Sequence, residues 1–206
     1  MISVLILAST GLLMFIIIGS TFQKLLKANE SGLLHLLLAF KFASWLLLPF
    51  AMYQVLGKPD FLWSGTFLGT ISLTLLTFTM VMQAGHLTYS AKQAKAGDSK
   101  VWEERDNWML DGLLAGVTEL FADVLKGVWV IMLTIAFWIQ GYTGMGIVGM
   151  LFSIFTVFYF FRLLDRAMVR EIAFFKKRTL NFWMVNLENF LLFLVMTGWL
   201  AIKVYT

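Results

Sequence analysis

The sequence contains no cysteine, only two histidines and two prolines, and charged residues make up just 14% of the chain. Without cysteine the chain can form no disulfide, no thiolate nucleophile and no cysteine-ligated iron–sulfur cluster. His35 and His86 alone do not favour a haem pair or a zinc site. The sequence also contains no serine-hydrolase, zincin or intramembrane aspartyl motif. We therefore expect no cofactor, no metal and no enzymatic activity.

What the sequence has in quantity is apolar residues. They form 60% of the 206 residues, with 20 phenylalanines and eight tryptophans, and the mean hydropathy is +0.82. Soluble domains average about 45–50% apolar and about 25% charged residues, so this composition indicates an integral membrane protein. No linker or low-complexity segment divides the chain, and we expect one transmembrane domain over residues 1–206. The first apolar run lacks a basic segment before it, which favours a membrane span over a signal peptide.

A membrane-spanning helix needs about 20 mostly apolar residues, and six stretches meet this requirement. We predict an all-α, polytopic protein with spans at 2–19, 32–56, 61–83, 113–140, 144–161 and 182–204. The connections after the first, third and fifth spans are long and charged, whereas those after the second and fourth are short.

The long connections carry twelve of the sixteen lysines and arginines. Because cytoplasmic loops collect these residues, we predict that all three are cytoplasmic, that both termini lie outside, and that the membrane is a bacterial inner (plasma) membrane. We expect the basic residues of the third loop to anchor on anionic lipid head groups, and we expect no nucleic-acid partner. These basic residues are Arg162, Arg166, Arg170, Lys176, Lys177 and Arg178.

Two spans are too short unless they include charged residues. The strictly apolar part of the fourth span, 128–139, rises roughly 18 Å, against about 30 Å of hydrocarbon. Asp123 and Lys126 are therefore drawn into the membrane, with Glu119 at its boundary. By the same reasoning the sixth span, whose apolar run at 190–202 is also short, brings in Asn186, Glu188 and Asn189. The second span carries Lys41. Since charges at this depth usually pair, we predict a polar cluster in which Lys41 pairs with Glu188 or Asp123.

A second interpretation of the same charges stays open. The apolar residues of 113–128 recur at helical spacing, so Glu119, Asp123 and Lys126 could instead stand in water, in an inner vestibule or on a protruding helix. Elsewhere, Gly65, Gly69, Gly149 and Ser153 predict close helix packing.

Two functions of different class follow. We favour a pore or transport protein, as a homo-oligomer, that passes ions or a small solute along a polar path in the cytoplasmic half of the bundle. The alternative is a non-catalytic membrane subunit of a larger complex whose cytoplasmic loops dock a soluble protein partner. We also predict a kink in the second span, because Pro49 removes a backbone hydrogen bond.

Overall fold

The computed structural model describes residues 1–97, 99–114, 116–168 and 182–205, and in these ranges it is helical without any β-strand. Six stretches of helix within them are long and apolar enough to cross a membrane, which confirms the predicted all-α class and the number of membrane-length helices. The helices are α1 (Ile2–Lys27), α2 (Ser31–Ala43), α3 (Leu48–Val55), α4 (Asp60–Ala96), α5 (Ser99–Asn107), α6 (Val117–Ile139), α7 (Thr143–Ala167) and α8 (Phe182–Tyr205), with a π-helix at Trp108–Leu114.

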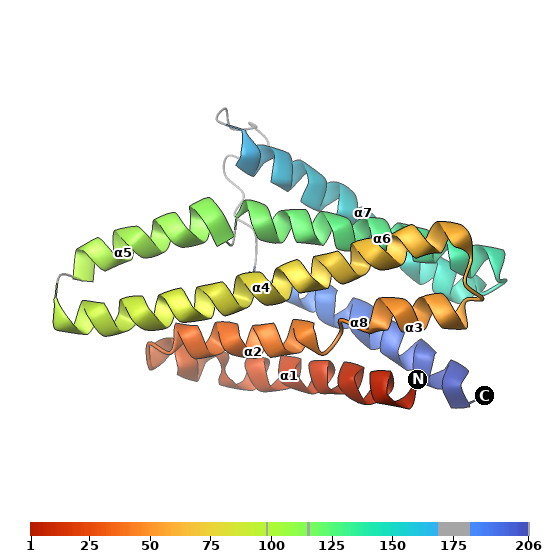
Figure 1. The fold of residues 1–206 in the computed structure, drawn as a ribbon, viewed down its shortest axis with the longest axis horizontal. Helices are drawn as coiled ribbons and strands as arrows, with labels where there is room; N and C mark the ends of the chain where they lie inside the picture. The colour runs from red at the N-terminus through yellow and green to blue at the C-terminus, as the bar shows by residue number, and fades with distance from the viewer. Residues whose placement is uncertain (98, 115, 169–181, 206) are drawn as a thin grey trace.

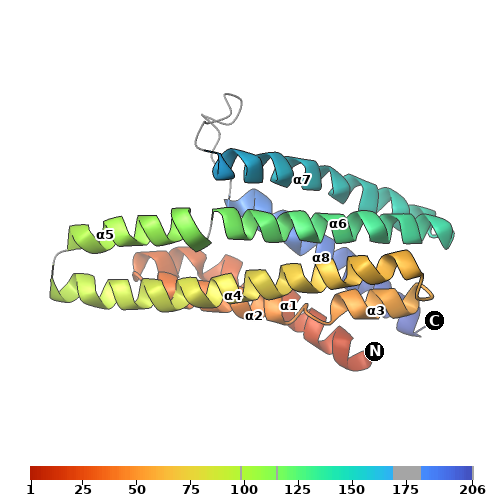
Figure 2. The ribbon, with the colours of Figure 1, turned by 45° about the horizontal axis from the view of Figure 1, so that its top comes forward.

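The long helices run back and forth between two ends of an elongated bundle (Figure 1). Both termini lie at one end, together with the α3–α4 and α6–α7 turns. At the opposite end α4 and α5 extend beyond the other helices (Figure 2). Helix α6 packs against α4 and α7, α2 packs against α4, and α1 packs against α2 and α8. Charged residues on α2, α6 and α8 are therefore carried by helices that belong to one bundle.

Helix α4 is longer than the span predicted for it. The apolar run suggested 61–83, whereas the helix continues to Ala96. Hydropathy marks where a segment becomes polar, but a polar segment rich in alanine, lysine and glutamine is still a good helix former. At 1.5 Å per residue the 37 residues of α4 extend for about 55 Å. Roughly half of that length therefore exceeds what the hydrocarbon core requires.

The second span is interrupted rather than merely kinked. Helix α2 ends at Ala43, residues 44–47 form a turn, and α3 begins at Leu48 with Pro49 in its first turn. Proline in this position has no N–H to donate, so its ring is tolerated only at a helix start. Trp45 fixes the turn from the side: it is fully buried, its indole N–H donates to Ala8 O of α1 at 3.0 Å, and its ring stacks on Phe193 of α8 at 4.0 Å.

Small residues set the spacing around α6. Gly65 and Gly69 of α4 both face α6, and a Cβ atom on Gly69 would lie 2.7 Å from the ring of Trp129. On the other side, Gly149 of α7 faces Thr134 of α6, whose Cβ atom would be 3.2 Å from an added Cβ. Each glycine therefore lets a bulkier side chain of α6 fit against the neighbouring backbone, which is the use of small residues expected between membrane helices.

Candidate functional site

The centre of the site is the ammonium group of Lys126, which lies on α6 with 2% of its side chain exposed. Its Nζ donates hydrogen bonds to Asp123 Oδ1 at 2.9 Å, Glu188 Oε2 at 2.8 Å and Asn189 Oδ1 at 2.8 Å. An ammonium group has three protons and no acceptor. Three acceptors therefore satisfy Lys126 completely, and they join α6 to α8.

Two further contacts hold the acceptors in place. The hydroxyl of Tyr159, from α7, donates to the same Glu188 Oε2 at 3.1 Å, and its ring lies 5.2 Å from Lys126 Nζ. The amide nitrogen of Asn189 donates to Val185 O at 2.9 Å, one turn earlier on α8. That bond turns Asn189 Oδ1 towards Lys126. The cluster thus connects three helices through hydrogen bonds that each fix a side-chain orientation.

Helical geometry explains why these residues meet. Asp123 and Lys126 are three positions apart on α6 and therefore share a face. Glu188 and Asn189 begin the buried stripe of α8, which continues at helical spacing through apolar side chains: Leu192, Phe193, Met196 and Leu200. Asp123 and Lys126 are only 3% and 2% exposed. The alternative in which these two residues stand in open water is therefore wrong.

Lys41 differs from the prediction made for it. Its side chain is fully buried on α2, but Nζ donates to the neutral Asn186 Oδ1 at 2.9 Å and lies 4.1 Å from the centre of the Phe42 ring. In the part of the chain that the structure describes, no carboxylate lies within ion-pair distance of it. The predicted pairing with Glu188 or Asp123 is wrong: both carboxylates bond to Lys126 instead.

Glu119 lies one turn before Asp123 on α6 and is half-buried. Its Oε1 accepts a hydrogen bond of 2.5 Å from the side-chain amide of Gln83 on α4. No lysine or arginine among the described residues pairs with it. Glu119 is therefore a carboxyl group within the bundle whose hydrogen-bond donor is neutral.

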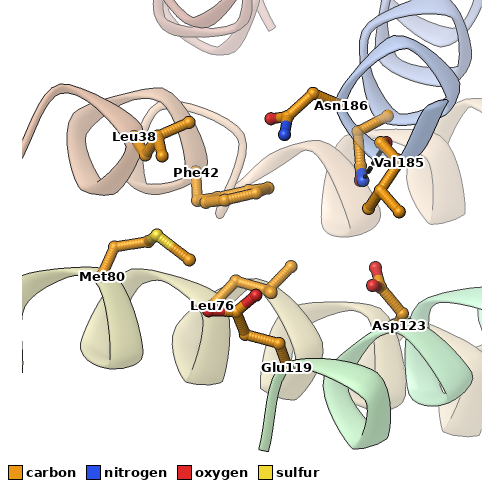
Figure 3. Close-up of a pocket in the computed structure, with 9 residues that line it drawn as sticks. Leu38, Phe42, Leu76, Met80, Glu119, Asp123, Val185 and Asn186 are labelled. Carbon is orange, nitrogen blue, oxygen red and sulfur yellow. Dashed lines mark hydrogen bonds between the residues drawn. The ribbon is translucent and has the colours of Figure 1, made fainter. Parts of the chain in front are cut away.

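A cavity of about 80 Å³ lies between α2, α4, α6 and α8 at this level. Its polar wall is formed by Glu119, Asp123, Asn186 and Asn189, and its apolar wall by five residues: Leu38, Phe42, Leu76, Met80 and Val185. Figure 3 shows the carboxyl groups of Glu119 and Asp123 and the amide of Asn186 directed into the space between the helices. The cavity therefore adjoins both Glu119 and the ion-paired Asp123.

The hydroxyl groups of α4 and α7 do not line this cavity. Thr66, Thr70 and Thr77 each donate to the carbonyl four residues earlier in α4, at 2.7–2.9 Å. Ser153 does the same in α7, donating to Gly149 O at 2.8 Å. These four hydroxyl groups are satisfied locally, whereas those of Ser72, Thr79 and Thr156 are buried without a hydrogen-bond partner among the described residues.

The arginines that we expect to contact lipid head groups differ in how far they are exposed. Arg162 is 4% exposed and its guanidinium lies 3.5 Å from Asp165, so its burial departs from the expectation of a surface anchor. Arg166 is exposed at the end of α7. Arg170 and the group Lys176, Lys177 and Arg178 lie outside the described residues.

Two members of the site, Gln83 and Tyr159, were not predicted. Gln83 ends an apolar run, so hydropathy places it at the limit of its span, although a polar side chain at that depth needs a partner. Tyr159 lies among phenylalanines, and the available signal is its phenolic hydroxyl group, which needs a hydrogen-bond partner when it is buried. Neither residue carries charge, so the pattern of charged residues within the spans does not indicate them.

The chemistry available to the site is proton and hydrogen-bond exchange. Among the described residues no group of three or more histidine, aspartate or glutamate side chains is arranged to hold a metal ion. No protein-family model, curated protein or solved structure matches the chain. Function is therefore inferred from the geometry of the cluster itself.

Proposed function

We propose that the protein is an integral membrane transport protein that moves an ion or a small solute through a polar path inside its helix bundle. The observation that supports this is the cluster around Lys126 together with the adjoining cavity. A charged residue within hydrocarbon costs at least about 2.5–3.5 kcal/mol, and intramembrane ionisable residues mark substrate paths and proton relays. This chain places five of them on α2, α6 and α8.

The path belongs to a single chain. Lys126, Asp123 and Glu188 are buried among helices of one protomer, so the cluster needs no second copy to be complete. In the homo-oligomer that we propose, each chain would carry its own path. A path inside each chain is proposed instead of a pore on the symmetry axis of the oligomer. Groups that line a pore on that axis must face outward from their own protomer, whereas the groups of this cluster face inward.

The distribution of basic residues supports an orientation in which both termini lie outside the cytoplasm. The ends of α1, α4 and α7, from which the three long connections start, lie away from the end that holds both termini (Figure 1). These connections hold twelve of the sixteen lysines and arginines. We propose that this end is cytoplasmic, in a bacterial inner membrane, and that exposed arginines such as Arg166 contact anionic lipid there. Glu119 then lies at the cytoplasmic mouth of the path, and Asp123 lies one turn deeper.

Proteoliposomes test this proposal. A potential-sensitive dye reports charge movement across the membrane when a gradient of sodium, potassium, chloride or protons is imposed in turn. We expect the wild type to move one of these ions, and Asp123→Asn and Glu188→Gln to lower the rate at least tenfold. Asp60→Asn is the matched control, because Asp60 is exposed in the first turn of α4. Equal rates in all variants would refute the path.

A second candidate function is supported by the extension of α4. The extension, α5 packed against it and the π-helix that follows present exposed charged and aromatic side chains, among them Tyr89, Arg105 and Trp108. A membrane subunit that docks a soluble protein would use such a surface. Native purification decides between the two: a stoichiometric soluble partner lost on Trp108→Ala, with no ion movement by the isolated chain, favours the subunit.

A further inference from the structure

The charges of the cluster do not balance. Its carboxyl groups are Glu119, Asp123 and Glu188, and its ammonium groups are Lys41 and Lys126. If all five were ionised, the interior would hold one negative charge in excess. Such a charge is costly in a region of low dielectric constant, and a carboxylate without a cation ordinarily takes up a proton instead.

The three carboxyl groups differ in their hydrogen-bond partners. Asp123 and Glu188 bond directly to the ammonium of Lys126, at 2.9 and 2.8 Å, and such bonds stabilise the ionised form. Glu119 bonds to the neutral amide of Gln83, while Lys41 bonds to Asn186. Asp123 also lies four residues after Glu119 on the same helical face, where a like charge opposes ionisation.

We propose that Glu119 carries an exchangeable proton and that the proton is the ion that moves along the path, an inference that rests on the proposed transport function. Half-buried Glu119 exchanges its proton with water at the end of the bundle opposite the termini. The cavity that it shares with Asp123, about 80 Å³, has room for at least two water molecules at about 30 Å³ each. Water there can link the two carboxyl groups.

The proton step conserves charge. The O–H bond of Glu119 breaks as its proton passes to a water molecule, and that water passes another proton to the Oδ2 atom of Asp123. Glu119 becomes a carboxylate, Asp123 becomes a carboxylic acid, and the net charge of the cluster stays the same. Lys126 keeps Glu188 and Asn189 as acceptors, at 2.8 Å each, so no buried ammonium group is left without a partner.

The other titratable groups near Glu119 constrain the step. Lys41 from α2 donates to Asn186, Lys126 from α6 donates to Glu188 of α8, and the hydroxyl group of Tyr159 from α7 donates to Glu188 as well. One turn after Gln83 on α4, His86 lies 2.8 Å from Asp106 and forms a separate pair. The partner of Glu119 on α4 is Gln83. Its side chain is a neutral amide, which does not take up a proton from a carboxylic acid.

Infrared difference spectroscopy of the reconstituted protein tests the proton directly. At neutral pH we expect the C=O band of a protonated carboxylic acid, shifted by exchange into D₂O and absent in Glu119→Gln. Glu104→Gln on exposed α5 is the matched control and should keep the band. Glu119→Asp, which retains a carboxyl group, should keep a displaced band. A wild type without the band, or Glu119→Gln with it, would overturn the assignment.

Proton uptake into liposomes with trapped pyranine tests the path. With a potassium gradient and valinomycin, we expect Glu119→Gln to lower uptake at least tenfold and Glu104→Gln to leave it unchanged. Sodium or potassium movement that depends on Asp123 without proton uptake would overturn the proton inference and leave transport standing. If the Glu119-dependent infrared band is present but no ion moves in any gradient, the proton on Glu119 stands and the transport proposal fails.

Discussion

Replacing Lys126 with methionine is the most direct perturbation of the cluster. Methionine has nearly the length of lysine, so the change removes charge and hydrogen bonds while leaving little empty volume. It deprives Asp123, Glu188 and Asn189 of a donor that lies 2.8–2.9 Å from each. The first two are then buried carboxylates with no cation bonded to them.

The expected cost is about 3–5 kcal/mol of unfolding free energy, which is the penalty for breaking a buried ion pair on one side. Three lost bonds to charged groups at about 1.5–3 kcal/mol each would give a larger sum. Asp123 and Glu188 can take up protons and so recover part of the lost free energy. The range of about 3–5 kcal/mol therefore applies. Reversible unfolding by dodecyl sulfate in mixed micelles, followed by circular dichroism, measures the change.

Two comparisons make this prediction refutable. Lys95→Met, an exposed position in the last turn of α4, should change stability by less than about 0.5 kcal/mol. Adding Asp123→Asn and Glu188→Gln to Lys126→Met should restore at least half of the loss, because the uncompensated charges are gone. If Lys126→Met unfolds within about 1 kcal/mol of the wild type, the ion pairs do not hold α6 to α8, and the reasoning fails.

Two further predictions concern packing and a single hydrogen bond. Gly69→Ala should destabilise the protein by about 1–3 kcal/mol, because the added methyl group overlaps the Trp129 ring at 2.7 Å. Gly85→Ala, which meets nothing within 4 Å in the same helix, should stabilise it by about 0.5–1 kcal/mol; equal effects in the same unfolding assay would contradict this. Tyr159→Phe should cost about 1.5–3 kcal/mol by losing its bond to the carboxylate of Glu188 at 3.1 Å, and a cost near zero would show that Tyr159 only packs.

The sequence determined the class of protein and the places where charge enters the bundle. Six apolar runs fixed the six membrane-length helices, since hydropathy and length are local properties of a segment. The shortness of the runs at 128–139 and 190–202 predicted that Asp123, Lys126 and Glu188 are drawn inward. All three are 5% exposed or less.

Only the tertiary structure decided which of these groups meet. Lys41, Asp123, Lys126 and Glu188 each lie on a predicted helix, but a hydropathy pattern leaves open how far each helix is rotated and shifted along its neighbours. The ring of Phe193 on α8 stacks on Trp129 of α6 and on Trp45, and in this packing Lys126, rather than Lys41, reaches Glu188. A pairing between residues 62 positions apart depends on helix packing, which no local pattern in the sequence specifies.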